Sequence, residues 1–361
     1  MADRTEAAVV ELGERADFEG RDKTTADAEH ASAPGSAPHP TVWSYLGVLG
    51  LACGVVQAVT GLMLGFVYQA TPDHAYTSVY YISQQMPYGW LVRTIHVWGG
   101  QLLIVVASLH AIRALARRSF TRPREANWVL GVLASLTTLA LALTGGLLPW
   151  DGKSYWSTAE NVALLRRLPL FGPQLVRGML GDATVGPTAL TRFYAAHLTL
   201  LPAAFAAFIV AHVWLARRQA APRVVSAVDS PWRRREGRRE AVRAAFQSQR
   251  FVALATAFAL LLCAIVVLAI VAPASLGLKA DPSAARVLVS PAWYLLSLRA
   301  LAQLLTPPAA AALPLLLGVA FAALPFVDRS LRSQPKGHDI TRAIGFVVLA
   351  AVALLTLIGI R

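Results

Sequence analysis

Residues 89–113 read GWLVRTIHVWGGQLLIVVASLHAIR, and residues 191–214 read TRFYAAHLTLLPAAFAAFIVAHVW. Each stretch is apolar, is long enough to cross a bilayer, and carries a histidine near each end. His96 and His110 are 14 positions apart, and His197 and His212 are 15 apart. At about 100° per residue, each pair returns to within roughly 40–60° of one helix face, and at about 1.5 Å per residue its members lie roughly 21–22 Å apart along the axis. The sequence therefore predicts two membrane helices, each with two imidazoles on one side.

Two such helices packed side by side would bring the imidazoles together as an upper pair and a lower pair. Neutral imidazole is a standard iron ligand, and iron at the centre of a planar macrocycle takes one axial ligand from each side. We therefore expect two bis-histidine haems stacked across the membrane. A single histidine in a membrane helix is more often an interhelical hydrogen-bond partner, but two matched pairs are hard to explain in that way. The remaining histidines lie in tails or loops and are interpreted as solvated residues: His30, His39, His74 and His338.

The composition is that of an integral membrane protein. Of the 361 residues, 56% are hydrophobic and only 15% are charged, which is too apolar for a soluble globular chain. Seven apolar runs are each long enough for one crossing. We therefore predict an all-α, polytopic membrane fold with about seven transmembrane helices. The runs cover residues 43–69, 90–115, 128–149, 192–216, 251–272, 309–327 and 343–360.

The formal charge of +13 follows the predicted topology and does not indicate a nucleic-acid partner. Basic residues concentrate in the loops after the second, fourth and sixth apolar runs, within residues 117–124, 217–250 and 329–336, whereas the loop 71–89 has no Lys or Arg. By the positive-inside rule, these basic loops and the N-terminus are cytoplasmic, and the C-terminus lies outside. We expect the protein in the inner (plasma) membrane of a bacterium.

Changes in composition divide the chain into four parts. Residues 1–40 are rich in Ala, Asp, Glu, Thr and Pro and predict a disordered cytoplasmic tail. Residues 41–220 hold the four-helix haem-binding bundle, the basic linker 221–250 follows, and residues 251–361 form a three-helix module. The long outer connection 152–190 contains the amphipathic stretch 168–186, where Pro and Gly break the chain into pieces too short to span, which we expect to be surface helices.

Glycines recur at the histidine spacing. Gly47 and Gly61 are 14 positions apart in the first apolar run, and Gly131 and Gly145 are 14 apart in the third. Glycine in a membrane helix usually allows close helix packing. Because both glycine pairs match the histidine spacing, we also expect the missing side chains to leave room for the edge of each macrocycle.

These features together resemble the cytochrome b family of quinol:cytochrome c oxidoreductases, found in bc and bf complexes. The resemblance is dense over residues 41–220 and thin over residues 270–300. The spacing of the second histidine pair, the Pro149-Trp150-Asp151 triplet and the seven-helix count look more like the photosynthetic bf type, whose cytochrome and subunit IV would here be fused into one chain. The motifs are Gln57-x-x-Thr60-Gly61, Gly89-Trp90-Leu91-x-Arg93-x-x-His96, His110-x-x-Arg113, Pro123-Arg124-Glu125-x-x-Trp128-x-x-Gly131, Leu148-Pro149-Trp150-Asp151 and Thr191-Arg192-Phe193-Tyr194-x-x-His197.

The resemblance implies two non-covalent b-type haems and assigns their ligands. His96 and His197 would bind the iron of the outer, low-potential haem, and His110 and His212 would bind that of the cytoplasmic-side, high-potential haem. Quinol oxidised at the outer face would give one electron to a Rieske iron–sulfur protein and the other to the outer haem, and quinone would be reduced near the inner haem. A c-type cytochrome subunit or another acceptor, the lipid membrane and a homodimeric complex complete the expected assembly.

The resemblance also implies cofactor contacts for arginines and glycines. Arg93 and Arg113 would pair with haem propionates, because a guanidinium is a charged, multidentate partner for a carboxylate. The alternative for both arginines is snorkelling at a helix end. The family's haem-packing glycines correspond to Gly47, Gly61, Gly131 and Gly145.

Two positions depart from the family pattern. Tyr45 occupies the place where bf-type proteins carry a cysteine for a covalent haem, so no covalent haem is predicted. The two cysteines, Cys53 and Cys263, lie inside predicted helices and are interpreted as small core residues. In Pro291-Ala292-Trp293-Tyr294, the family has Glu or sometimes Asp between Pro and Trp, a carboxylate thought to accept a proton from quinol. Alanine cannot accept a proton.

We expect the quinol-oxidation region around Trp293, Tyr294 and Asp151, with three ways to meet the loss of the carboxylate. Asp151 or Glu160 could accept the proton from the neighbouring outer loop, water could carry it to Asp281, or quinol oxidation could be slow or lost. Because Asp151 sits next to Trp150 at a helix end, a purely structural role explains it equally well.

Two other functions share part of this pattern. An electron-conducting anchor would hold the same two haems and pass electrons between the quinone pool and a soluble dehydrogenase or reductase, without bifurcation. A neighbouring gene for a Rieske protein favours the first function, whereas a molybdenum or flavin subunit favours the anchor. A haem-free scaffold or transporter would require the histidine and glycine pairs to be coincidental. The pattern therefore favours an enzyme, as a subunit of a quinol-oxidising membrane oxidoreductase in respiratory electron transport.

Overall fold

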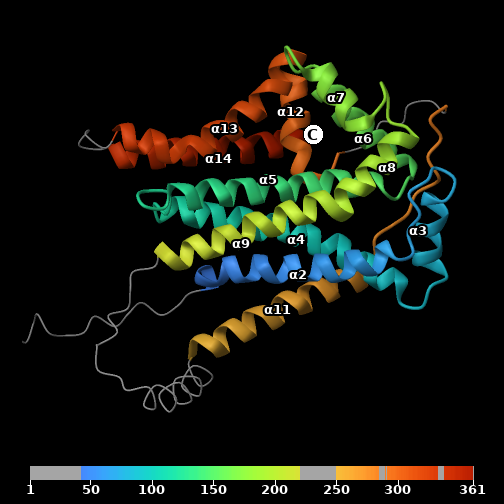
Figure 1. The fold of residues 1–361 in the computed structure, drawn as a ribbon, viewed down its shortest axis with the longest axis horizontal. Helices are drawn as coiled ribbons and strands as arrows, with labels where there is room; N and C mark the ends of the chain where they lie inside the picture. The colour runs from blue at the N-terminus through green and yellow to red at the C-terminus, as the bar shows by residue number, and fades with distance from the viewer. Residues whose placement is uncertain (1–41, 220–248, 284–288, 290, 332–336, 361) are drawn as a thin grey trace, which may run out of the picture. The chain divides into compact units, whose positions relative to one another are not determined.

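The computed structural model describes residues 42–219, 249–283, 289, 291–331 and 337–360 (Figure 1). Within these ranges the chain is helical, and its extended pairing is limited to an isolated bridge between Asp151 and Lys279. The predicted disordered tail 1–40 lies outside the described residues, as does the predicted basic linker 221–250 apart from its last two positions.

Among the described helices, seven spans are long and apolar enough to cross a membrane, which confirms the predicted number. The chain is therefore an all-α, multi-pass membrane protein. The fourth span combines α8, a π-helical turn and α9. The spans are α2 (Leu46–Gly65), α4 (Gly89–Ala116), α5 (Glu125–Leu147), α8 (Pro187–Ala195) with α9 (Leu201–Gln219), α11 (Gln249–Val271), α13 (Pro307–Leu331) and α14 (Gly337–Gly359).

Helix α2 shows how these helices suit a lipid environment. Val55, Val59 and Leu62 each leave more than half of their surface uncovered, although all three are apolar. Cys53 lies on another face of the helix and is fully buried. A helix that is apolar on both its packed and its open face belongs in lipid. Cys263 in α11 is exposed, so its interpretation as a core residue is wrong: that position lies on an open face of an apolar helix.

The helices that carry the histidines pack against two others. Helix α4 packs against α2, α5 packs against α9, and α4 and α5 also contact each other (Figure 1). Helix α13 contacts α5, where Trp128 Nε1 donates to Phe321 O at 2.9 Å, and α14 contacts α4, where Gly345 lies against Leu115. The boundary between a four-helix and a three-helix module stays a prediction.

Shorter helices fill the connections. The connection 152–190 contains α6 (Gly152–Leu165) and α7 (Gly172–Leu180). Helix α7 lies in the stretch 168–186 and confirms a short helix there, whereas α6 precedes that stretch. They pack over a buried cluster that includes Trp150, Tyr155 and Phe193. Three further short helices lie in segments predicted only as connections: α3 (Ala75–Gln84), η3 (Trp293–Leu295) and α12 (Leu296–Leu304). The 3-10 turn η1 (Val42–Tyr45) lies at the start of the first predicted run, directly before α2.

The fourth span contains a π-helical turn around the first histidine of the second pair. The turn covers Ala196–Leu200, and Leu201 N–H donates to a carbonyl five residues back. Pro202 follows directly; it has no N–H to donate, and its ring crowds the preceding turn. A π turn accommodates one extra residue within a helix. The 15-residue spacing of the second histidine pair is therefore equivalent to the 14-residue spacing of the first.

Candidate functional site

The four histidines singled out in the sequence meet as two pairs. Helix α4 carries His96 and His110, the π turn carries His197, and α9 carries His212. The ring centroids of His96 and His197 are 6.2 Å apart with an interplanar angle of 77°, and those of His110 and His212 are 6.2 Å apart with an angle of 74°. Two helices thus present facing imidazoles at two levels.

The separation within each pair fits two axial ligands of one iron. A metal–imidazole bond is about 2 Å long and the nitrogen lies about 1.1 Å from the ring centre, so imidazoles on opposite sides of an iron have centres roughly 6 Å apart. In the part of the chain that the structure describes, no group of three or more His, Cys, Asp and Glu side chains is placed to hold an ion. The separation of the rings therefore suits an iron with one imidazole on each side.

Hydrogen bonds to Nδ1 orient three of the four rings. A carbonyl oxygen only accepts, so Nδ1 of His197 and of His212 carries the proton, and Nε2 keeps its lone pair. An imidazole held through Nδ1 presents Nε2 to a metal. The bonds join His96 to Thr60 Oγ1 at 2.9 Å, His197 to Leu141 O at 3.0 Å, and His212 to Asn127 O at 2.9 Å.

Each of the four predicted glycines lies against one of these rings. A Cβ atom added to Gly145 would lie 2.5 Å from His197 Cε1, closer than real Cβ atoms approach. In the structure the absent side chains leave room for the imidazoles, and the room expected for a macrocycle edge stays a prediction. The corresponding distances are 3.0 Å from Gly61 to His96, 3.2 Å from Gly47 to His110, and 3.3 Å from Gly131 to His212.

The two arginines expected to meet propionates have different surroundings. Arg93 is buried and donates to Ser83 Oγ at 3.2 Å, Ala274 O at 2.7 Å and Ser275 O at 2.9 Å, which ties α4 to the segment after α11. Arg113 Nε is buried and has no hydrogen-bond partner among the described residues. A buried guanidinium donor without a partner fits a carboxylate that the chain does not itself supply.

Trp293 and Tyr294 lie in the short turn η3, and Ala292 immediately precedes it. Trp293 Nε1 donates to Gln101 Oε1 of α4, and no sequence pattern indicates this contact because 192 positions separate the two residues. Burial raises the pKa of the Tyr294 phenol above its ordinary value. Tyr294 therefore stays protonated near neutral pH and can donate a hydrogen bond, but it cannot serve there as a base.

The carboxylate of Asp151 accepts hydrogen bonds from the backbone of two separate segments of the chain. Its side chain is buried (6% exposed) and caps α6: Oδ1 accepts from Ser154 N at 2.8 Å, and Oδ2 accepts from Gly277 N at 2.8 Å. Asp151 N donates in turn to Ser154 Oγ at 3.0 Å, which completes a capping box. The carboxylate joins the start of α6 to the segment around Gly277, and these contacts favour the structural explanation of Asp151.

This arrangement leads to a prediction about stability. Replacing Asp151 by alanine should destabilise the protein by about 2 kcal/mol or more, because a helix cap contributes about 1 kcal/mol and a buried N–H left unpaired costs about 1–3 kcal/mol. Asp151→Asn keeps an acceptor for the cap and should lose less. Thermal unfolding in detergent, followed by circular dichroism, measures both. Equal losses of stability in Asp151→Asn and Asp151→Ala, or no loss in either, would contradict the structural role.

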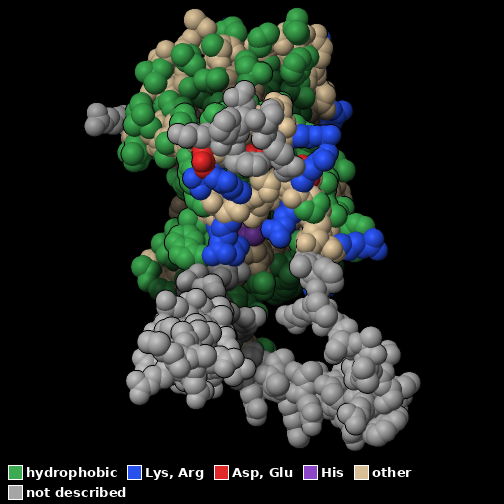
Figure 2. Space-filling view, turned by 90° about the vertical axis from the view of Figure 1, so that its left-hand side faces the viewer, with side chains coloured by type: hydrophobic (Ala, Val, Ile, Leu, Met, Phe, Trp, Pro, Cys, Tyr) green, Lys and Arg blue, Asp and Glu red, His purple; other side chains and the backbone are tan. Residues whose placement is uncertain are grey.

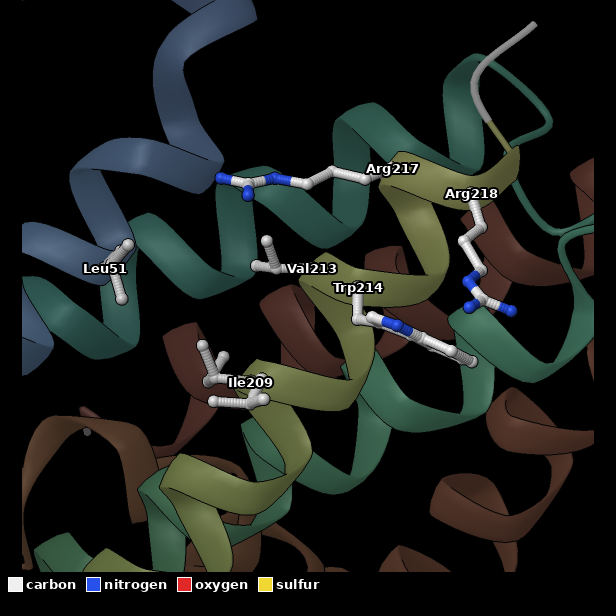
Figure 3. A pocket seen from close by; sticks show the side chains of 7 residues that line it. Leu51, Ile209, Val213, Trp214, Arg217 and Arg218 are labelled. Atoms are coloured by element: carbon white, nitrogen blue, oxygen red, sulfur yellow. The ribbon is translucent and has the colours of Figure 1, made fainter. Parts of the chain in front are cut away.

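A cavity of about 480 Å³ opens beside the last turns of α9 (Figure 3). Arg218 Cζ lies 4.2 Å from the centre of the Trp214 ring, and the Arg217 side chain extends toward the α2 side of the cavity. Val213 and Trp214 directly follow His212 in α9, so the cavity lies at the same level along that helix as His212. The apolar wall is formed by Leu51, Ile209, Val210 and Val213.

Basic side chains gather over the end of the helices at which this cavity lies (Figure 2). Two contacts tie that end together: Arg118 after α4 pairs with Asp339 of α14, and Gln219 of α9 donates to Pro123 O at 2.7 Å. Which side of the membrane this end faces stays a prediction. The basic residues at the ends of α4, α9 and α13 include Arg113, Arg117, Arg118, Arg217, Arg218 and Arg329.

Comparison with known sequences extends these observations. Residues 33–220 match the family model described as Cytochrome b/b6/petB. A cytochrome b6 of Picosynechococcus sp. is 35% identical over 202 residues, which are 56% of this chain and 91% of the relative. A cytochrome b6 of Synechocystis sp. is 37% identical over 182 residues, which are 50% of this chain and 82% of the relative.

Comparison with solved structures shows the same fold over nearly the whole chain. A chain of a hyperthermophilic respiratory complex III matches with a TM-score of 0.64 and 21% identity, covering 90% of this chain and 93% of that one. The family match covers just over half of the 361 residues, and the cytochrome b6 relatives are matched over most of their length. The chain therefore belongs to the cytochrome b/b6 family, whose members bind b-type haem.

Proposed function

We propose that this chain is the di-haem cytochrome b subunit of a quinol:cytochrome c oxidoreductase-type complex in respiratory electron transport. The observation that carries the proposal is the two histidine pairs, each with 6.2 Å between ring centroids, on helices long enough to cross a membrane. Membership of the cytochrome b/b6 family supports it.

The histidines would hold two non-covalent b-type haems. His96 and His197 would be the axial ligands at the outer level, and His110 and His212 those at the cytoplasmic-side level. Each bound haem supplies a one-electron iron couple, so two levels give electrons a route across the membrane. The Nδ1 hydrogen bonds hold the rings in place, and the glycines let the rings lie close to α2 and α5.

The arginines would neutralise the propionates. Arg113 Nε is the buried donor without a partner, and it would meet a propionate of the inner haem. Arg93 already donates three hydrogen bonds to the chain, but a guanidinium has five N–H donors, so it retains capacity for the outer haem.

We place quinol oxidation near Trp293 and Tyr294, where Gln101 connects their turn to the helix that carries His96. The residues of this site provide no evident base to remove a proton from quinol. Ala292 supplies no carboxylate, Tyr294 stays protonated, and Asp151 already accepts two backbone hydrogen bonds. We therefore expect quinol oxidation to be limited by proton transfer to water or to a more distant group such as Glu160 or Asp281.

The cavity at the end of α9 is the proposed quinone-reduction site. Its apolar wall would accept a quinone ring and the start of its tail. Arg217 could donate to a carbonyl oxygen of quinone and stabilise the negative charge that develops during reduction. The basic end that contains the cavity would be cytoplasmic by the positive-inside rule, which places the C-terminus outside.

The proposed partners follow from this role. A Rieske iron–sulfur protein would accept the first electron from quinol, and a c-type cytochrome subunit or another acceptor would follow. The complex would be a homodimer in a bacterial plasma membrane, with residues 251–361 as the subunit IV-like part. The absence of a carboxylate at Ala292 favours one alternative, a di-haem anchor that passes electrons between the quinone pool and a soluble dehydrogenase or reductase.

A redox titration of the haem spectrum of the purified chain tests the proposal. We expect two b-type haems per chain with separate potentials, and duroquinol should reduce the outer one in an inhibitor-sensitive way. Ala292→Glu should accelerate that reduction by about tenfold or more, since a positioned general base contributes at least that much. Two haems that quinol cannot reduce from the outer face, in either protein, would favour the anchor, and a chain without haem would refute both functions.

The quinone-reduction site is tested in the same preparation. Val213→Trp would fill part of the cavity and should slow the reoxidation of the inner haem by added quinone. The matched change Val210→Leu, on the same wall, should have a smaller effect. Equal reoxidation rates in the wild-type and Val213→Trp proteins would remove the cavity from the reaction.

A further inference from the structure

The hydrogen bonds to Nδ1 differ between the two histidine pairs. At the outer pair, both rings have acceptors: Thr60 Oγ1 for His96, and Leu141 O for His197 with Thr144 Oγ1 at 3.2 Å as a second. At the inner pair, His212 has Asn127 O, whereas His110 Nδ1 is buried and has no hydrogen-bond partner among the described residues. The outer pair is therefore the better supplied with acceptors.

The direction of the bond to Thr60 follows from its other contact. Thr60 Oγ1 donates its only proton to Val56 O at 2.6 Å, so it must accept from His96 Nδ1–H. Thr144 Oγ1 likewise donates to Ala140 O at 2.8 Å and accepts from His197. Both threonines are therefore fixed as acceptors by the helix that carries them.

We propose that this unequal supply of acceptors, with Thr60 as the principal side chain, lowers the reduction potential of the outer haem relative to the inner one. An imidazole that donates from Nδ1 carries more negative charge on the nitrogen that meets the metal. That charge stabilises ferric iron over ferrous iron, and hydrogen bonding around the axial ligands is one of the means by which proteins set haem potentials. The inference rests on the proposed haem-binding function.

A second effect acts in the same direction and must be separated from it. The inner pair lies near the basic end, where Arg113 and Arg117 follow His110 on α4. Positive charge there also favours the reduced haem, which carries one positive charge fewer. A test must therefore remove a hydrogen bond without changing any charge, and Thr60→Val does so with a side chain of similar shape.

The experiment is a potentiometric titration of both haems in the Thr60 variants. Thr60→Val should raise the equilibrium constant for reduction of the outer haem about fivefold, the size of one neutral hydrogen bond. At about 59 mV per tenfold for a one-electron couple, this is a shift of about 40 mV. Thr60→Ser keeps the hydroxyl and should keep the wild-type potential, and the inner haem should be unchanged in both.

Thr138→Val is the matched control, because Thr138 also lies buried in a spanning helix and donates to a carbonyl four residues back, Ala134 O at 3.0 Å. It should shift neither potential. The inference would be overturned if Thr60→Val left the potential of the outer haem unchanged, or if Thr60→Ser or Thr138→Val shifted that potential equally. In these cases the two bound haems would still support the proposed function. A chain that binds no haem would instead overturn the proposed function.

Gly47 provides the converse test, since a Cβ there would lie 3.5 Å from His110 Nδ1. Gly47→Ser brings a hydroxyl acceptor to this nitrogen, and Gly47→Ala adds the same bulk without it. The inner haem of the serine variant should have a reduction constant about fivefold lower than that of the alanine variant. Equal constants in the two variants would count against the proposal.

Discussion

Replacing His197 by alanine should remove one of the two haems and leave the other in place. The ring of His197 faces that of His96 at 6.2 Å, and alanine leaves the outer iron with one axial imidazole, whereas His110 and His212 keep their own pair. We expect the haem content of the purified protein to fall from about two per chain to about one, since each iron takes its two axial ligands from one pair. A pyridine haemochrome assay measures the content.

The remaining haem identifies which site was lost. The haem that remains in His197→Ala should be the higher-potential one, and the haem that remains in His212→Ala should be the lower-potential one. Redox titration of the two variants should therefore show one potential each, and the two potentials should differ. His74→Ala is the matched control: His74 is exposed, and its Nδ1 contacts Thr71 Oγ1 at 3.1 Å. It should retain both haems. A His197→Ala protein that kept two haems, or that stayed folded with none, would contradict the assignment of separate pairs.

Gly145→Ala should weaken the binding of the outer haem, although it removes no ligand of the iron. The added Cβ would lie 2.5 Å from His197 Cε1, and that ring is already held by its Nδ1 bond to Leu141 O. Overpacking of this kind costs about 1–3 kcal/mol, which corresponds to a loss of haem affinity between roughly fivefold and a hundredfold. Haem retention during dilution, followed at the absorption band of the outer haem, measures the loss.

The neighbouring position supplies the control. A Cβ added to Gly146 meets nothing within 4 Å, so Gly146→Ala makes the same chemical change in the same turn of α5 without touching the ring. It should retain both haems. Gly131→Ala, where the Cβ would lie 3.3 Å from His212 Cε1, should have a smaller effect on the inner haem. If Gly145→Ala and Gly146→Ala lost haem equally, helix packing would explain the effect of the substitutions, and the contact with His197 would not.

The sequence by itself determined the membrane fold and the residues of the candidate haem sites. Seven apolar runs predict seven spans, because a bilayer requires about 20 apolar residues from each helix and leaves few alternatives. Histidines repeated at nearly whole numbers of turns predict facing pairs, because helical periodicity fixes the side of a helix on which each residue lies. Local rules of this kind need no knowledge of distant contacts, so the geometry of one helix was enough to place His96 and His110 on the same side of it.

Only the tertiary structure decided what the neighbours of these residues do. The π turn around His197 gives the 15-residue spacing of the second histidine pair the same helical phase as the 14-residue spacing of the first. Asp151 looked like a substitute base, but its carboxylate accepts from Gly277, 126 positions away, and Trp293 meets Gln101 across 192 positions. Contacts over such separations leave no periodic signal in the chain. They arise when packed helices bring distant backbone and side-chain groups together, and unpaired buried groups are costly enough to select those partners.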